Sequence, residues 1–128
     1  MNGRIPKSPE PWPETAEFWN QANSNRLVLM RCRTTGKPYF FPRPHSPFTG
    51  GNDTEWIDAS GRGTIYSFSV LPRSEPKYCI AYITLEEGPT ILSNVLMEDL
   101  GTVRIGQAVR VSFVASENGQ LVPMFVAD

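Results

Sequence analysis

The second half of this 128-residue chain contains five short runs with the two-residue periodicity of β-strands, separated by turns. The runs cover residues 64–70, 78–85, 90–96, 109–114 and 121–126. Asn118-Gly119, before the last run, is a typical tight-hairpin sequence. Short strands at this spacing would leave exposed edges unless the sheet closed on itself. The pattern therefore predicts a mostly β chain with a small, closed or nearly closed barrel.

The first half of the chain predicts three smaller units. Residues 1–13 contain four prolines and are expected to form an extended arm. Pro13 suits the start of a helix over 14–25, in which Phe18 and Trp19 form an apolar stripe. We interpret this stripe mainly as packing against the domain, with docking of Phe18 and Trp19 on a partner as the alternative.

Residues 26–58 are expected to form a small β hairpin with two turns. A strand over 26–31 leads into a knuckle-like turn, and a second strand over 39–41 pairs back onto it. A loop rich in Pro and Gly follows, and the strand pattern resumes near Trp56. The predicted domain organisation is thus an arm (1–13), a helix (14–25), a hairpin unit (26–58) and a barrel (59–128).

The charge of the chain is unevenly distributed although the formal net charge is only −1. Residues 1–43 contain seven Lys and Arg against three acids, and residues 44–128 contain five against ten. No acid occurs from Arg26 to Arg43, a stretch with five bases. An acidic ligand or partner is therefore expected at the N-terminal half. A general nucleic-acid binder would have a basic surplus overall, which this chain does not have.

Bases and aromatic rings are interleaved in that basic stretch. Such a combination suits a nucleotide moiety, either in single-stranded nucleic acid or in coenzyme A. A solvated strand face is an equally weighted alternative. The candidate residues for binding CoA or a partner are Arg31, Arg33, Lys37, Tyr39, Phe40, Phe41 and Arg43.

The two turns of the hairpin unit have the outline of zinc knuckles but lack the ligands. A structural zinc site needs four good ligands, usually thiolates. Cys32 is the only cysteine at the four expected positions, the others being Thr35, Ser46 and Thr49. His45 lies beside the third position rather than on it. Because neutral hydroxyls bind zinc poorly, no bound zinc or other cofactor is expected.

No catalytic motif emerges from the sequence. Cys32 and His45 have no third group that would orient the base, so catalysis by this pair is not expected. Cys79 lies in an apolar run and is interpreted as a buried free thiol. No apolar stretch approaches the length of a membrane span and no signal-peptide pattern opens the sequence, so the cytoplasm is the expected compartment.

Several motifs resemble the DUF35 family. They are the helix with Phe18 and Trp19, the Cys-x-x-Thr-Gly turn at 32–36, the Phe-Pro-Arg-Pro run at 41–44, the Ser-Gly-Arg-Gly-Thr-Ile-Tyr-Ser-Phe run at 60–68 and the Arg-Ile-Gly-Gln-Ala-Val run at 104–109. The resemblance implies a rubredoxin-like zinc ribbon followed by a five-stranded OB-fold barrel. Here the ribbon departs from the family pattern at three of four ligand positions.

The resemblance also implies a non-catalytic accessory role. Members of this family accompany thiolase-like, hydroxymethylglutaryl-CoA synthase-like or MaoC-like enzymes, and are thought to complete the CoA channel. The expected function is thus a subunit of an acyl-CoA-processing complex in lipid metabolism, with a thiolase-like partner as first choice, acyl-CoA as a possible ligand and a homodimer as a possible state. The alternative is an OB-fold module that binds single-stranded nucleic acid. A free-standing thioesterase or acyltransferase is the least favoured reading.

Overall fold

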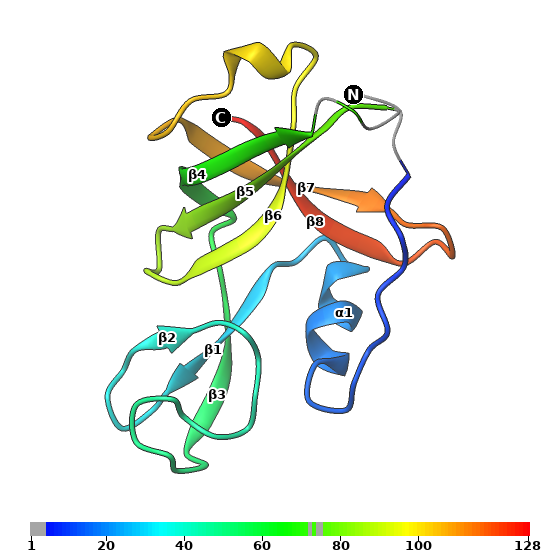
Figure 1. Cartoon of the computed structure of the whole chain (residues 1–128). Coiled ribbons are helices and arrows are strands. Elements are labelled where there is room, and N and C mark those ends of the chain that lie inside the picture. Colours follow the sequence, from blue (N-terminus) through cyan, green and yellow to red (C-terminus); the bar gives the residue numbers. More distant parts are fainter. Residues whose placement is uncertain (1–4, 72, 74–75) are drawn as a thin grey trace.

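The computed structural model describes residues 5–71, 73 and 76–128. It shows a small three-stranded sheet and one helix beside a five-stranded barrel (Figure 1). The N-terminal elements are the helix α1 (Ala16–Ala22) and the strands β1 (Val28–Cys32), β2 (Pro38–Tyr39) and β3 (Thr54–Asp58). In the sheet, β1 lies between β2 and β3 and pairs antiparallel with both. This sheet is the ribbon of the predicted fold.

The five predicted strands after residue 61 close into a barrel in the order β4-β5-β6-β8-β7. Among the described residues β6 and β8 form the only parallel pair, and β4 pairs with β7 to complete the ring. The predicted five-stranded OB-fold is confirmed. The barrel elements are β4 (Arg62–Leu71), β5 (Tyr78–Leu85), β6 (Thr90–Leu96), the 3-10 helix η1 (Leu100–Thr102), β7 (Ala108–Ala115) and β8 (Leu121–Ala127).

Gly63, the last residue of the Ser-Gly-Arg-Gly run at 60–63, lies where the barrel closes. It pairs with Leu85 of β5 on one side and with Val109 of β7 on the other. A Cβ atom at this position would lie 2.5 Å from the carbonyl oxygen of Thr84. Only glycine lets the backbone of β4 approach β5 so closely at this position.

The barrel core consists of the inward positions of the alternating strands. Ile65, Ile83, Val95, Val109 and Phe125 are almost completely buried. This burial follows the two-residue periodicity of the sequence, because alternate side chains of a strand point to opposite faces. Cys79 lies in the same core, as expected of a buried thiol.

The helix closes the space between the barrel and the ribbon. It packs against β1 and β8 (Figure 1). The Asn23 side-chain oxygen after the helix accepts a hydrogen bond from the amide of Leu121, at 3.0 Å, which ties the helix end to β8. Phe18 is 3% exposed and belongs to the main core. The preferred interpretation, that the stripe packs against the domain, therefore holds for Phe18.

Two elements are shorter than the sequence pattern predicts. The helix covers 16–22 rather than 14–25, and Asn25 after it adopts a left-handed conformation that ends the turn. The second ribbon strand stops at Tyr39 instead of Phe41. Phe40 packs against Phe18, and Pro42 has no amide hydrogen to continue a ladder. The four-part division of the chain stays a prediction, and residues 1–4 of the arm lie outside the described residues.

No helix among the described residues combines the length and the apolar character that crossing a membrane requires.

Candidate functional site

The two turns of the ribbon, one starting at Cys32 and one at Ser46, have the same backbone hydrogen bonds. In each, the first residue donates its amide to the carbonyl five residues later, at 3.0 Å and 2.8 Å. In each, a glycine four residues later donates back to the first carbonyl, Gly36 at 2.8 Å and Gly50 at 2.9 Å. Both glycines have positive φ angles, 73° and 76°. The knuckle geometry therefore persists in both turns.

Hydroxyl groups occupy the ligand positions and serve the backbone. Thr35 and Thr49 each accept a hydrogen bond from the amide two residues later, at 3.3 Å and 3.1 Å. The Ser46 hydroxyl accepts hydrogen bonds from the amides of Phe48 and Thr49, at 3.0 Å and 3.3 Å. These side chains satisfy turn amides within the knuckles themselves.

The Cys32 thiol joins the two turns. It is completely buried. Hydrogen bonds from the side chains of Ser46 and then Thr35 lower the pKa of Cys32 to about 7. Three of the four former ligand positions thus meet at one sulfur atom.

This donor set does not fit a structural zinc ion. It offers one thiol with neutral hydroxyls, whereas a closed zinc site takes four thiolate, imidazole or carboxylate ligands. His45 is exposed at the surface of its loop. Among the described residues, no three His, Cys, Asp or Glu side chains gather where they could hold a metal.

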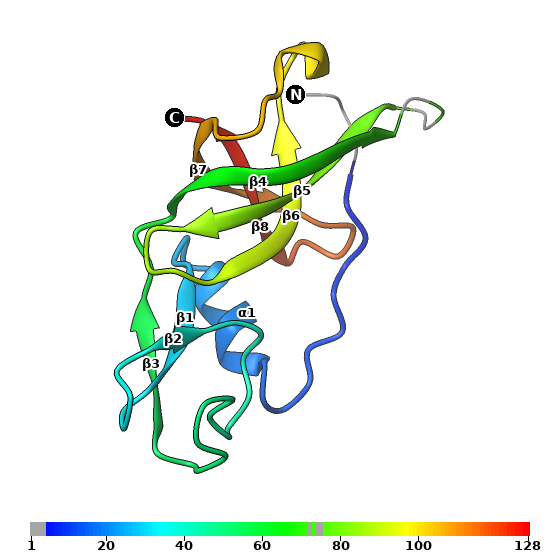
Figure 2. The ribbon, with the colours of Figure 1, turned by 60° about the vertical axis from the view of Figure 1, so that its left-hand side comes forward.

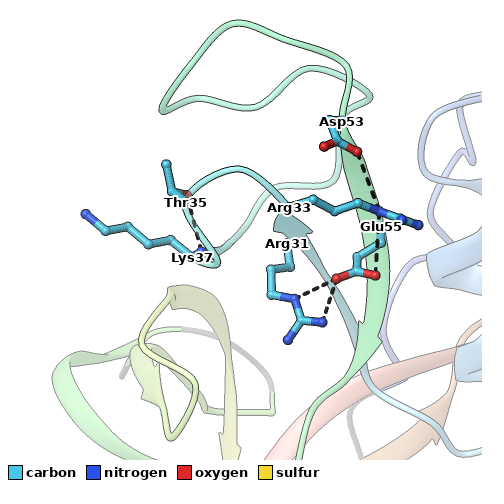
Figure 3. Close-up of polar contacts among 6 residues, drawn as sticks. All are labelled: Arg31, Arg33, Thr35, Lys37, Asp53 and Glu55. Atoms are coloured by element: carbon cyan, nitrogen blue, oxygen red, sulfur yellow. Dashed lines mark hydrogen bonds and ion pairs between the residues drawn. The ribbon is translucent and has the colours of Figure 1, made fainter.

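Two bases of the stretch from 26 to 43 lie opposite acidic residues that come later in the sequence (Figure 3). The antiparallel register places Arg31 opposite Glu55 of β3, and Arg31 Nε donates to Glu55 Oε2 at 2.8 Å. Arg33 Nε lies 3.7 Å from carboxylate oxygens of both Asp53 and Glu55. The hydrogen bond from Arg31 lowers the pKa of Glu55. This surface is therefore less positive than the sequence alone suggests.

Lys37 and Arg43 lie over aromatic rings of the ribbon. Lys37 Nζ lies 5.5 Å from the centre of the Phe48 ring, and Arg43 Cζ lies 5.6 Å from that of Tyr39. Tyr39 is 4% exposed, and its hydroxyl donates to the Arg43 carbonyl at 2.6 Å. Tyr39 therefore supports the loop from inside and does not present its ring for stacking.

The predicted aromatic residues form a continuous chain of rings between the helix and the ribbon. The ring centres of Trp19 and Phe18 are 4.9 Å apart, those of Phe18 and Phe40 are 5.6 Å apart, and those of Phe40 and Phe41 are 5.2 Å apart. Phe41, at the end of this chain, is 49% exposed. The structure thus brings together Trp19, Phe40 and Phe41 from separate parts of the sequence, with Phe18 beneath them.

These rings form one wall of an apolar groove with a volume of about 500 Å³. The other walls are the N-terminal arm, with Pro6, Lys7 and Pro9, and the barrel strands β6 and β8, with Leu92 and Met124. A second groove of about 450 Å³ shares Pro9, Trp19 and Phe41 with the first and extends to Arg43. We call the first of these the arm groove.

Sequence reasoning missed the contributions of Lys7, Pro9 and Leu92 to the arm groove. The sequence held a signal for Leu92, which is an apolar residue at an outward position of an alternating strand. In the structure its side chain is 58% exposed. No local signal existed for Lys7 or Pro9, since their place depends on how the arm crosses the barrel.

Models of the ChsH2 family match both parts of the chain. The model described as the rubredoxin-like zinc ribbon domain of ChsH2 matches residues 19–46, and that of the C-terminal OB-fold domain of ChsH2 matches residues 56–114. A chain of the solved structure named "Ltp2-ChsH2(DUF35) aldolase" superposes with a TM-score of 0.83 at 26% identity, over 94% of this chain and 98% of that one. This chain belongs to the DUF35 family.

Two curated relatives are similar to this chain, and the name of one of them refers to acyl-CoA metabolism. A "Probable enoyl-CoA hydratase alpha subunit" of Thermomonospora curvata is 27% identical over 94% of this chain and 40% of its own length. A "DUF35 domain-containing scaffold protein" of Methanothermobacter thermautotrophicus is 30% identical over 70% of this chain and 59% of its own length. The DUF35 chain described here thus spans less than two thirds of either relative.

Proposed function

We propose that this DUF35 chain is a non-catalytic accessory subunit of an acyl-CoA-processing complex, contributing to acyl-CoA binding and to docking of the partner enzyme. The arm groove is the observation that carries the proposal. It is a concave apolar surface with few polar groups, which is the usual character of a small-molecule site. The names of the two relatives, one an enoyl-CoA hydratase subunit and the other a scaffold, support the same role.

The exposed bases of the ribbon are proposed to attract the CoA phosphates. Lys37 and Arg43 contact rings only through weak cation–π geometry, so a phosphate can pair with them at little cost. Arg31 and Arg33 contribute after exchanging part of their contact with Glu55 and Asp53 for a phosphate oxygen. Phe41 offers its exposed ring to the ligand or the partner, and the buried Phe18 and Tyr39 position this surface from below.

The ribbon is proposed to work without zinc. The thiol and hydroxyl side chains at the former ligand positions already satisfy the knuckle amides and join the two turns. If docking is the task of the ribbon, its shape is what the complex needs.

A thiolase-like enzyme is the proposed partner, following the family resemblance. The test is affinity purification of the tagged full chain from its native host, followed by mass spectrometry. We expect a thiolase-like enzyme in stoichiometric amount. Phe41→Asp should reduce its recovery, whereas Phe48→Asp, at a ribbon residue of similar exposure outside the arm groove, should not.

Other outcomes of this purification would change the proposal in defined ways. Stoichiometric recovery of a hydratase or a synthase acting on CoA esters would correct only the partner class. Recovery of nucleic-acid-processing proteins alone, with salt-sensitive binding of an oligonucleotide, would favour the single-stranded nucleic-acid alternative. Turnover of acyl-CoA by the isolated chain, lost in Cys32→Ala, would contradict the non-catalytic role.

A further inference from the structure

The arm groove is lined by five segments of the chain, which come from the arm, the helix, the ribbon and the barrel strands β6 and β8. The arm descends beside the barrel and α1 before it turns into the helix (Figure 2). Pro6 and Pro9 of the arm line the groove together with Trp19 of the helix, Phe41 of the ribbon and Leu92 of the barrel. A concavity of about 500 Å³ lies within the range of sites that hold small organic ligands.

The wall formed by the arm is fastened to the barrel. The Pro6 carbonyl accepts a hydrogen bond from the amide of Glu117, at 3.1 Å, in the turn between β7 and β8. The Ser8 hydroxyl accepts one from the amide of Asn118, at 2.9 Å, in the same turn. Because the arm is held at two points, the groove is preformed and a ligand need not order this wall on binding.

The polarity of the arm groove selects one part of an acyl-CoA molecule. Among the described residues that line it, Lys7 is the one ionisable residue, and most of the other side chains are apolar. A single ammonium group does not balance the several phosphate charges of CoA. The adjoining groove adds Arg43 but also Glu10 and Glu14, so it is not a phosphate pocket by itself, and the ribbon bases proposed to attract the phosphates lie outside the arm groove. A ligand with an apolar group linked to an anionic carrier matches this mostly apolar lining with its lysine.

We propose that the arm groove holds the apolar acyl group of an acyl-CoA thioester, while Lys7 attracts the anionic carrier. The inference rests on the proposed function, to which it adds the part of the ligand that this chain recognises. Leu92 and Phe41 at the rim lose exposed apolar surface when the acyl group enters. Each methylene that becomes buried strengthens binding by about fourfold, following the usual transfer energy of a CH₂ group.

The test is calorimetric titration of the full chain with CoA, acetyl-CoA, hexanoyl-CoA and decanoyl-CoA. We expect affinity to rise with chain length by about fourfold per methylene until the groove is filled. Leu92→Asp should weaken decanoyl-CoA binding at least tenfold and weaken CoA binding no more than Ile105→Asp does. Ile105→Asp is the matched control, because Ile105 is 70% exposed and lies outside both grooves. Phe41→Ser is a second variant at an exposed position, expected to act in the same direction as Leu92→Asp.

The outcomes separate this inference from the proposed function. Affinity that is independent of acyl length, or equal effects of Leu92→Asp and Ile105→Asp, would overturn the acyl site. If an acyl-CoA enzyme still co-purifies in that case, the accessory role stands and the arm groove serves as a protein contact. Length-dependent binding of acyl-CoA without any acyl-CoA enzyme among the captured proteins would support the site and contradict the accessory role.

Discussion

The barrel encloses the side chains of Ile83, Val109 and Phe125, whereas the ribbon encloses a thiol beside a serine hydroxyl. Strand pairing closes the barrel on itself, so every inward side chain has apolar neighbours on several strands. The ribbon has only three strands, one of them two residues long, and two turns held by polar side chains. The comparison indicates that hydrophobic burial stabilises the barrel and strand β1, whose Val28 and Leu29 belong to the same core, while hydrogen-bond geometry maintains the two turns of the ribbon.

The largest effect is expected from a cavity in the barrel. Phe125→Ala removes a completely buried ring and should destabilise the chain by about 3–5 kcal/mol. Equilibrium unfolding in urea measures this loss. The control is Leu92→Ala at an exposed position, which should cost less than about 1 kcal/mol. Equal costs for the two variants would contradict the assignment of Phe125 to the core.

A smaller effect is expected from the ribbon hydroxyl that serves two amides. Ser46→Ala leaves the amides of Phe48 and Thr49 without their acceptor and should cost about 1–3 kcal/mol. Thr35→Ala is the matched control, because Thr35 is exposed and its hydroxyl accepts from one amide at 3.3 Å. Urea unfolding compares the two, and hydrogen exchange should place the loss from Ser46→Ala in the ribbon. A larger cost for Thr35→Ala would show that the network is wrongly assigned.

The Cys32 thiol should make stability depend on pH. Its pKa is about 7 in the folded chain, below the ordinary value of 9.0, so the folded state loses this proton first. The resulting stabilisation is fully present above pH 9 and is lost as the pH falls through 7. Cys79 contributes to the pH dependence of stability with the opposite sign, because burial raises its pKa.

Comparing the wild type with Cys32→Ser isolates the contribution of Cys32 to the pH dependence of the free energy of unfolding. Urea midpoints measured from pH 6.5 to 9.5 should rise more steeply in the wild type than in the variant. Parallel curves for the two chains would contradict the lowered pKa of Cys32.

The ion pair between the ribbon strands should contribute little. A double-mutant cycle on Arg31→Ala and Glu55→Ala should give a coupling of about 0.2–1 kcal/mol, because both side chains are partly exposed to water. The coupling should decrease in 1 M salt. A coupling that salt leaves unchanged would indicate that the pair is more deeply shielded than its exposure suggests.

A metal chelator should have no effect on the native chain. The donor set of the ribbon does not fit zinc, so a metal chelator is expected to leave the unfolding midpoint unchanged. The matched variant is the triple substitution Thr35→Cys, Ser46→Cys and Thr49→Cys, which restores four thiols on the retained turns. This variant should bind one zinc ion and become sensitive to the chelator. Stoichiometric zinc in the purified native chain would overturn the metal-free ribbon.

Much of the fold was predictable because its signals are local. Alternation along 64–70 and 78–85 specifies which side chains face inward, whatever the neighbouring strand is. The knuckles were recognisable from glycines at fixed distances from Cys32 and Ser46, since a turn depends on a few consecutive residues. The helix and β2 were overestimated in length, because their ends depend on packing and on Pro42 rather than on periodicity alone.

The sequence by itself determined the closed barrel, the shape of the ribbon and the loss of the zinc ligands. Only the tertiary structure decided that Arg31 and Arg33 face Glu55 and Asp53, because strand pairing joins residues twenty or more positions apart. It also decided that Phe18 and Tyr39 are buried while Phe41 stays exposed. The arm groove arises in the same way, since its walls meet only when the arm is fastened across the barrel. Local patterns determine the elements, and long-range contacts determine which surface the elements leave for a ligand.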